Sequence, residues 1–188
     1  NTFGPDNFKF ITNQIWTVYP DGSIELQSAI TSNNPQLILP RLGYQMKVNK
    51  DLDNFTYYGR GPIENYADRK TGQFVSQYSS KVADQFVDYA KPQNMANHED
   101  VRWAALTDNR DGAIFIAPDN MSTTALQYSE LDLMYAPHPY QLPKAGDTYL
   151  HLDLGMTGLG GTSCGQDAPF ESDRVRAASQ MFSFIIRP

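Results

Sequence analysis

The chain has 188 residues, of which 40% are hydrophobic and 19% charged, and its formal net charge at pH 7 is −6. This composition is typical of a folded globular protein and excludes an intrinsically disordered chain. The acidic balance argues against a nucleic-acid partner and against a basic membrane-binding surface, and a single cysteine excludes an internal disulfide.

The length predicts a single domain, residues 1–188. No apolar run approaches the roughly 20 residues that a membrane span needs. The sequence opens on Asn1 without an initiator methionine or a signal peptide. We interpret this start as an internal cut from a longer polypeptide or as a trimmed mature end.

Short strands joined by tight turns begin near the N-terminus. Residues 15–19 are rich in β-branched and aromatic side chains, and residues 24–30 place an apolar side chain at nearly every second position. Between them lie Asp21 and Gly22, a dipeptide that strongly favours the turn of a β-hairpin. We therefore expect these two runs to pair as antiparallel strands.

A second pair of strands is predicted in the middle of the chain. Residues 101–106 and 112–117 flank a turn that is rich in aspartate and asparagine and ends in glycine. The second run is continuously apolar, so we expect a strand that is buried on both faces and ends at Pro118.

Helix signals are few. Residues 129–136 form a short helical pattern that Ser129 can cap, and a proline follows it. Residues 148–156 alternate leucine with polar side chains, which predicts a strand with one buried face, and residues 182–186 repeat the alternation. Many short strands at this spacing indicate an all-β fold, an antiparallel sandwich.

The first segment with chemical content is residues 59–69, Gly-Arg-Gly-Pro-Ile-Glu-Asn-Tyr-Ala-Asp-Arg. One interpretation makes Glu64 and Asp68 an acid–base pair. The other, which the residue types favour, is a loop braced by arginine–carboxylate bonds with Tyr66 packed beneath it.

The second segment is a polar loop, residues 91–100, that leads into a strand. His98 next to Glu99 has the composition of a general base with its orienting carboxylate. A solvated loop histidine fits the same sequence, and we favour it.

The third segment is the glycine-rich run 154–166. It lacks the Gly-Lys-Ser/Thr ending of a phosphate-binding loop and no helix is predicted after it, so we reject nucleotide binding. Glycines let a backbone approach a ligand closely, and Ser163 and Cys164 would be presented there. The alternative is a tight exit from the preceding strand. A nucleophilic role for Cys164 requires a neighbouring base, which the sequence does not identify.

Metal ligands are not indicated by spacing. The three histidines, His98, His138 and His151, lie far apart without an i, i+4 pair, and the carboxylates are scattered. The sequence therefore predicts no metal site.

Taken together and in order, these segments resemble the C-terminal, small-chain domain of family 2 β-galactosidases. The similarity extends from about residue 19 to the end of the chain. The matching residues are 39–43, 59–69, 92–93, 100–103, His138 and 158–165. One departure is Asn94, because the family often has glutamate after Pro-Gln.

The resemblance implies a super-sandwich of antiparallel sheets, similar to galactose mutarotase. It implies a parent enzyme that cleaves terminal β-galactosides with retention, using two glutamates in a barrel domain that this chain does not contain. The expected partners are that barrel domain, a galactoside and, in the parent enzyme, a second copy in a homo-oligomer. No cofactor is expected in this domain, and a magnesium or sodium ion only in the parent.

Within the family one loop of the last domain lines the sugar pocket with a tryptophan or a cysteine. The resemblance assigns that place to Cys164, as a wall of the pocket and not as a nucleophile, with hydroxyl groups of Ser163 and Thr162 nearby. Two other hypotheses stay open. One is a carbohydrate-binding module that uses the abundant aromatic residues, and the other is a sugar isomerase that uses His98 or His138 with a carboxylate.

Overall fold

The computed structural model describes residues 7–108, 110–160 and 169–188, and these ranges fold almost entirely into antiparallel strands. The strands are β1 (Phe10–Val18), β2 (Ile24–Ser32), β3 (Ile38–Leu39), β4 (Arg41–Val48), β5 (Asn54–Gly61), β6 (Phe74–Lys81), β7 (His98–Thr107), β8 (Gly112–Leu126), β9 (Thr148–Met156), β10 (Val175–Arg176) and β11 (Gln180–Arg187). The helical elements are α1 (Glu130–Tyr135) and the 3-10 turns η2 (Val82–Gln85), η3 (Pro139–Gln141) and η4 (Glu171–Asp173). None of these helices has the length and hydropathy that crossing a bilayer requires.

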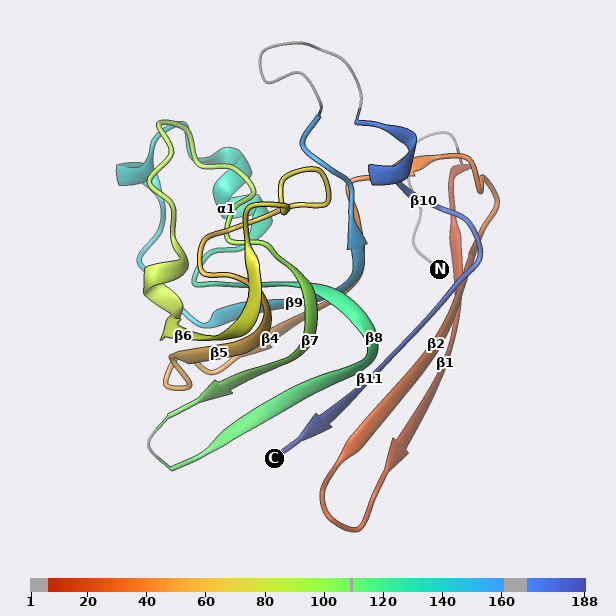
Figure 1. Cartoon of the computed structure of the whole chain (residues 1–188), viewed down its shortest axis with the longest axis horizontal. Helices are drawn as coiled ribbons and strands as arrows, with labels where there is room; N and C mark the ends of the chain where they lie inside the picture. Colours follow the sequence, from red (N-terminus) through yellow and green to blue (C-terminus); the bar gives the residue numbers. More distant parts are fainter. Residues whose placement is uncertain (1–6, 109, 161–168) are drawn as a thin grey trace.

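Nine of the strands form one sheet that branches at β8. The main path runs β1-β2-β11-β8-β7-β5-β6, and the second half of β8 pairs in addition with β9, which pairs with β4. Figure 1 shows the result: the β1–β2 hairpin forms one side of the molecule, strands β4 to β7 form the other, and β11 lies between them. The all-β, antiparallel sandwich class predicted from the sequence is confirmed.

The N-terminal hairpin forms as predicted. Strands β1 and β2 pair over their whole length, from Phe10 opposite Ser32 to Val18 opposite Ile24. The turn between them places Gly22 at a positive φ of 84°, which glycine adopts without a Cβ penalty. The Asp21 carboxylate accepts a hydrogen bond from the Ser23 amide at 2.9 Å. Both residues of the predicted dipeptide therefore stabilise the turn.

The middle hairpin differs from prediction in two respects. Strand β8 does not end at Pro118 but continues to Leu126, because its second half leaves β11 and pairs with β9. The run Gly112–Ala117 is not buried on both faces. Phe115 is 3% exposed whereas Ile114 is 39% exposed, because the side of the sheet opposite the core is open to solvent here.

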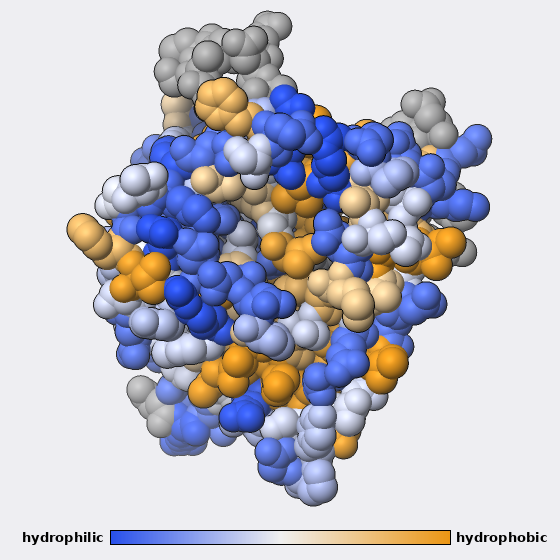
Figure 2. Space-filling view, turned by 45° about the vertical axis from the view of Figure 1, so that its right-hand side comes forward, coloured by the Kyte–Doolittle hydropathy of each residue, from blue (hydrophilic) through white to orange (hydrophobic). Residues whose placement is uncertain are grey.

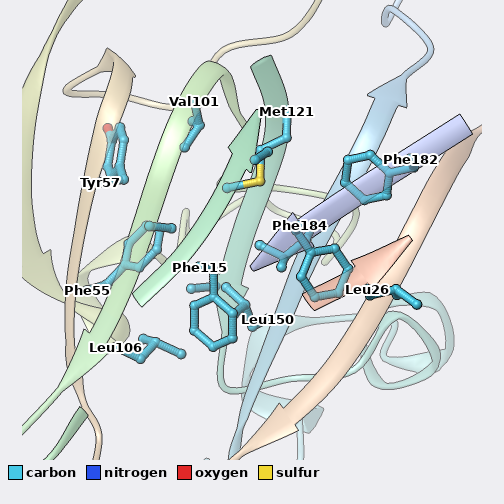
Figure 3. Close-up of a cluster of buried hydrophobic side chains, with 14 of the residues drawn as sticks. Leu26, Phe55, Tyr57, Val101, Leu106, Phe115, Met121, Leu150, Phe182 and Phe184 are labelled. Carbon is cyan, nitrogen blue, oxygen red and sulfur yellow. The ribbon is translucent and has the colours of Figure 1, made fainter. Parts of the chain in front are cut away.

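The main core lies between the two arms of the branched sheet (Figure 3). Aromatic and aliphatic side chains from six strands meet there, among them Leu26, Phe55, Phe115, Leu150 and Phe184. Each alternates along its strand with an outward-facing residue, so the period-two pattern of the sequence reports this core directly. Burial of such side chains is worth about 1.5–3 kcal/mol each.

Strand β9 has the bounds predicted from its alternation, but both of its faces are covered. Leu150 and Leu152 enter the core, while His151 and Asp153 on the other face are 6% and 1% exposed. The reason is tertiary: α1 and the side chains of β4 lie over that face. The expected single buried face is therefore wrong, and the second face holds a buried polar cluster.

The predicted helix forms with the predicted cap. Helix α1 begins after Ser129, whose hydroxyl oxygen accepts a hydrogen bond from the Asp132 amide at 3.1 Å, and the Asp132 carboxylate bonds back to the Ser129 amide at 2.8 Å. This capping box lets so short a helix persist against the sheet.

Apolar side chains also reach the surface. Figure 2, which turns the side of the β1–β2 hairpin forward, shows them in several places between polar residues. On strand β1, Ile15 is 63%, Trp16 53% and Val18 72% exposed. Strand β1 is an edge of the sheet, so the backbone groups along its outer side pair with no other strand among the described residues.

Candidate functional site

The three segments singled out in the sequence meet at one end of the molecule. The first forms the loop after β5, the second the loop before β7, and the third the exit of β9 (Figure 1). Side-chain and backbone hydrogen bonds join each of these loops to the next. The candidate site is this loop assembly, defined as residues 61–73, 91–100 and 156–160.

Asn65 joins the first loop to the second. Its side chain is completely buried, and Nδ2 donates hydrogen bonds to the carbonyls of Arg60 and Ile63, both at 3.0 Å. Oδ1 accepts from the Glu99 amide at 2.9 Å, and the main chain of Asn65 exchanges two further bonds with Asn97. One amide side chain therefore holds two loops together. The sequence did not predict this role, because only the charged residues of the segment were considered as functional candidates.

Glu64 braces the same two loops. Its carboxylate accepts hydrogen bonds from Arg69 at 2.7 Å and from the Ala96 amide at 2.8 Å, and Tyr89 donates a very short bond to it. Tyr66 is buried beneath the loop, and burial raises its pKa well above the ordinary value. The braced-loop interpretation of this segment is confirmed, and the contacts of Glu64 are those of a structural carboxylate.

Asp68 joins the first loop to the third. Its Oδ2 accepts a hydrogen bond from the Gly160 amide at 2.7 Å. Gly158 lies against the same carboxylate, since a Cβ at that position would be 2.6 Å from the Asp68 Cγ. The glycine at 158 is therefore required by close packing against Asp68. Asp68 thus holds the start of the glycine-rich loop and is not paired with Glu64 as an acid–base couple.

The exit of β9 is held from its other side as well. The Thr157 hydroxyl donates to the Leu39 carbonyl at 2.6 Å and accepts from the Val175 amide at 2.8 Å. The Gly158 amide donates to the Asp173 carbonyl at 2.8 Å. The chain therefore enters the glycine-rich segment from a fixed position, which agrees with the interpretation of this segment as a tight strand exit.

Charged side chains that are partly or fully buried lie next to the second loop. Arg60 pairs closely with Asp100, and Lys70 Nζ lies 3.0 Å from the Asp100 carboxylate. Glu99 accepts hydrogen bonds from Asn97 at 2.8 Å and Ser122 at 2.7 Å. Burial raises the pKa of Glu99, and these hydrogen bonds oppose the rise. The cluster is satisfied internally and stabilises the loop.

His98 is not the solvated loop histidine that the sequence favours. It is 1% exposed, its ring stacks on Tyr57 at 4.2 Å between centroids, and Nε2 lies 2.6 Å from the Gln85 side-chain oxygen. The prediction was wrong because β7 begins at His98, so the side chain points into the sandwich. Burial lowers the pKa of His98 to about 4, which keeps the imidazole neutral.

We expect His98 to make the fold sensitive to mild acid. The folded pKa of about 4 lies below the ordinary 6.5, so unfolded chains take up a proton first as the pH falls. Stability is full above pH 6.5 and decreases by about 3 kcal/mol as the pH approaches 4. Urea unfolding between pH 7 and 4.5 should show a shallower loss for His98→Gln than for wild type. His138→Gln, at an exposed histidine, should leave the wild-type slope unchanged.

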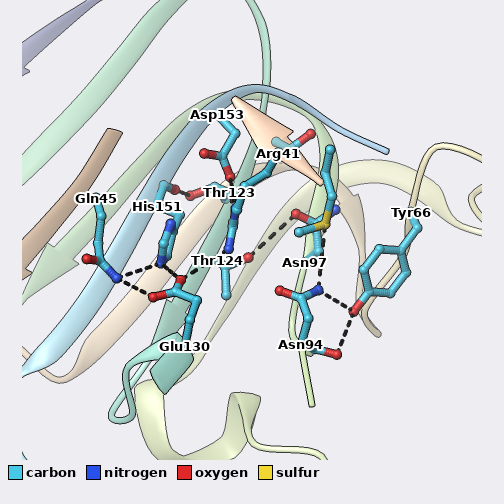
Figure 4. Close-up of polar contacts among 12 residues, drawn as sticks. Arg41, Gln45, Tyr66, Asn94, Asn97, Thr123, Thr124, Glu130, His151 and Asp153 are labelled. Carbon is cyan, nitrogen blue, oxygen red and sulfur yellow. Dashed lines mark hydrogen bonds and ion pairs between the residues drawn. The ribbon is translucent and has the colours of Figure 1, made fainter. Parts of the chain in front are cut away.

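The histidine that does meet a carboxylate is His151. It lies on β9 and its Nε2 is in close contact with Glu130 of α1, while Gln45 of β4 bonds to Glu130 and lies 3.1 Å from the same nitrogen (Figure 4). Within the described ranges His98 and His138 form no ion pair, and His138 stacks on Tyr140. The sequence placed His151 on a strand but held no signal that a helix residue would approach it.

Thr162, Ser163 and Cys164 lie outside the described residues, so their predicted place beside a sugar stays a prediction. In the described part of the chain no three histidine, cysteine or carboxylate side chains converge as a metal site would require. The structure thus describes the base of the glycine-rich loop and the residues that hold it.

The fold defines a β-sandwich domain in which hydrogen bonds join three loops at one end. The chain belongs to the β-galactosidase small-chain family. The model of that family matches residues 3–186. This confirms the resemblance inferred from the ordered motifs.

Individual relatives agree with the family match. The chain is 32% identical over 147 residues to a β-galactosidase of Priestia megaterium, which covers 78% of this chain and 14% of the relative. It is 30% identical over 175 residues to a β-galactosidase of Halalkalibacterium halodurans. That match covers 90% of this chain and 17% of the relative. A β-galactosidase of Kluyveromyces lactis is 28% identical over 178 residues. That match covers 94% of this chain and 17% of the relative. The chain therefore matches only 14% to 17% of the length of these relatives.

Proposed function

We propose that the chain, residues 1–188, is a single accessory domain at the C-terminal end of a larger β-galactosidase. The observation that carries this proposal is the family match over nearly the whole chain, together with its small share of each relative. In this role the domain completes one wall of the active site. A barrel domain of the same polypeptide supplies the catalytic glutamates, and the reaction releases terminal β-galactose with retention.

The contacts of the described carboxylates support a non-catalytic role. A retaining pair needs two carboxyl groups about 5 Å apart on either side of the sugar, one of them free to attack. Glu64 and Glu99, the two glutamates of the loop assembly, each accept several hydrogen bonds from neighbouring residues. Both side chains are also largely buried, with exposures of 8% and 10%.

The exposed strand β1 supports a domain that packs against other parts of its polypeptide. Three large side chains on this edge, Ile15, Trp16 and Val18, are more than half exposed. Exposed apolar side chains along an unpaired sheet edge are a common mark of an interface. The proposed neighbours are the barrel domain and, in the parent enzyme, a second copy. A magnesium or sodium ion, where the parent uses one, is assigned to the parent and not to this domain.

The proposed contact with substrate is Cys164, with Ser163 and Thr162 beside it. The fixed base of their loop supports this assignment, because a wall residue acts only if its position is defined. A cysteine gives a smaller wall and a weaker contact with a sugar ring than an aromatic side chain does. It leaves space that a larger aglycone can enter.

The test compares the 188-residue chain with the complete polypeptide on a chromogenic β-galactoside. We expect hydrolysis by the complete polypeptide and none by the chain alone. Cys164→Trp should lower KM for small galactosides several-fold by adding a stacking surface, and Cys164→Ala should raise it slightly. Galactose released by the isolated chain would contradict the placement of catalysis elsewhere, and identical kinetics for both variants would remove Cys164 from the sugar pocket.

Asp68 gives a separate prediction for the same loop. In the complete polypeptide, Asp68→Ala removes the acceptor for Gly160, a net loss of about 1 kcal/mol of loop anchoring. We expect KM to rise roughly fivefold with a smaller change in kcat, because the sugar wall is displaced while the catalytic groups stay in place. Asp51→Ala, at an exposed carboxylate in the turn between β4 and β5, is the control and should leave both constants unchanged.

A further inference from the structure

A cavity that shares no lining residue with the loop assembly lies elsewhere in the structure. It has a volume of about 400 Å³ and opens between the edge strand β1, the β4–β9 pair and helix α1. Its lining joins apolar residues of β1, β2 and β4 to the polar cluster of Figure 4. This volume is within the range of small-molecule sites in proteins.

The polar wall of the cavity is ordered by internal contacts. Arg41 Nε donates to Asp153 at 3.0 Å, and its Nη1 donates to Glu130 at 3.3 Å. Gln45 Nε2 donates to the other oxygen of Glu130 at 2.6 Å. The buried members, His151 and Asp153, orient the more exposed ones, since the Glu130 side chain is 44% exposed and Gln45 is exposed.

The charges of this wall select against charged ligands. Two carboxylates, Glu130 and Asp153, surround one guanidinium, Arg41, which pairs with both, so the wall offers an anion no free positive charge. The place that a cation would take beside the carboxylates is already filled by Arg41. Burial opposes the ionisation of Glu130, but the adjacent His151 and Arg41 lower its pKa to about 2, so it acts only as an acceptor near neutral pH.

The cavity lining contains both hydrogen-bond donors and acceptors. The Glu130 carboxylate accepts, the Arg41 guanidinium donates, and the amides of Gln45 and Gln14 do both. Gln14 is held in place by its hydrogen bond to the Tyr44 hydroxyl at 2.9 Å, and Tyr44 in turn donates to Ser28 at 2.6 Å. Hydroxyl groups are the ligand groups that donate and accept at once, so adjacent hydroxyls match this pattern.

The opposite wall is apolar. Phe10, Ile30 and Leu42 line it, and the Phe10 ring is fixed by an edge-to-face contact with Phe8 at 4.9 Å between centroids. A ligand that fills the cavity therefore needs a hydroxyl-bearing edge and an apolar C–H face. A pyranose ring has both.

We propose that this cavity binds a neutral monosaccharide, with Glu130, Arg41 and Gln45 bonding to its hydroxyl groups and Phe10 covering its C–H face. The residues that line this site belong to none of the segments 61–73, 91–100 and 156–160. The site gives the domain a sugar-binding function of its own, independent of the proposed role in an active-site wall.

The experiment is an NMR titration of the isotope-labelled 188-residue chain with galactose and with glucose. We expect saturable shifts, at millimolar concentrations, in the side-chain amides of Gln45 and Gln14 and in the backbone of β4 and β9. Gln45→Ala should weaken binding at least about tenfold, because a hydrogen bond next to a carboxylate is lost from an exposed residue that the fold does not need. Gln77→Ala, at an exposed glutamine on β6, is the matched control and should bind as wild type does.

Two further variants keep the result interpretable. Gln14→Ala tests the cavity from the other sheet edge, so a folding defect of one variant does not decide the outcome. Cys164→Ala should leave binding unchanged. Absence of saturable shifts, shifts confined to other surfaces, or equal affinity in Gln45→Ala and Gln77→Ala would overturn the proposal. Loss of binding in Cys164→Ala would assign the sugar to the glycine-rich loop and would equally overturn it.

Discussion

Gly43→Ala is expected to unfold the domain or to destabilise it by more than about 4 kcal/mol. Gly43 faces Asp153 at the point where the β4–β9 register shifts, and a Cβ there would overlap the Asp153 Cα and the Leu152 carbonyl. These are backbone atoms of the neighbouring strand, so no rotamer change relieves the overlap. The two strands must separate, and the Arg41–Asp153 pair separates with them.

The measurement is urea unfolding of the 188-residue chain at neutral pH. Gly72→Ala is the matched control, since a Cβ at that position meets no heavy atom within 4 Å. It should unfold like wild type or at slightly higher urea, because alanine restricts the unfolded chain more than glycine does. Equal midpoints for the two variants would show that the β4–β9 contact tolerates a side chain.

Asn65→Ala is expected to cost about 4 kcal/mol, since it removes three hydrogen bonds from a completely buried position. The carbonyls of Arg60 and Ile63 and the amide of Glu99 lose their partner at a place that water does not reach. Asn65→Asp should be at least as damaging, because a carboxylate cannot donate to the two carbonyls and brings a buried charge.

The corresponding control is Asn49→Ala. Asn49 is exposed and its side chain accepts one hydrogen bond, from the Asp51 amide at 3.0 Å, so we expect a loss below about 1 kcal/mol. Thermal unfolding followed by circular dichroism separates the two sites. A small and equal effect at both positions would mean that the first two loops are joined mainly through Glu64.

The sequence predicted which segments form the site better than it predicted what each residue in them does. It singled out residues 59–69 correctly, yet it assigned importance to the charged Glu64 and Asp68 and passed over Asn65. Neutral amides carry no charge pattern along a sequence, and the value of Asn65 arises only when two loops bring three backbone groups around it. The burial of His98 was predicted wrongly for a related reason. Whether a polar residue at the boundary between a loop and a strand is buried depends on the sheet that the strand joins.

The sequence by itself determined the strand pattern, the hairpin at residues 21–22, the capped helix and the family, because these depend on local turn chemistry, period-two burial and ordered motifs. Tertiary structure alone decided that β8 pairs with β7, β11 and β9, that both faces of β9 are covered, and that His151 meets Glu130. Such contacts join residues distant in sequence, and they exist only after the sheet has branched. No periodicity along the chain encodes which helix will lie over which strand.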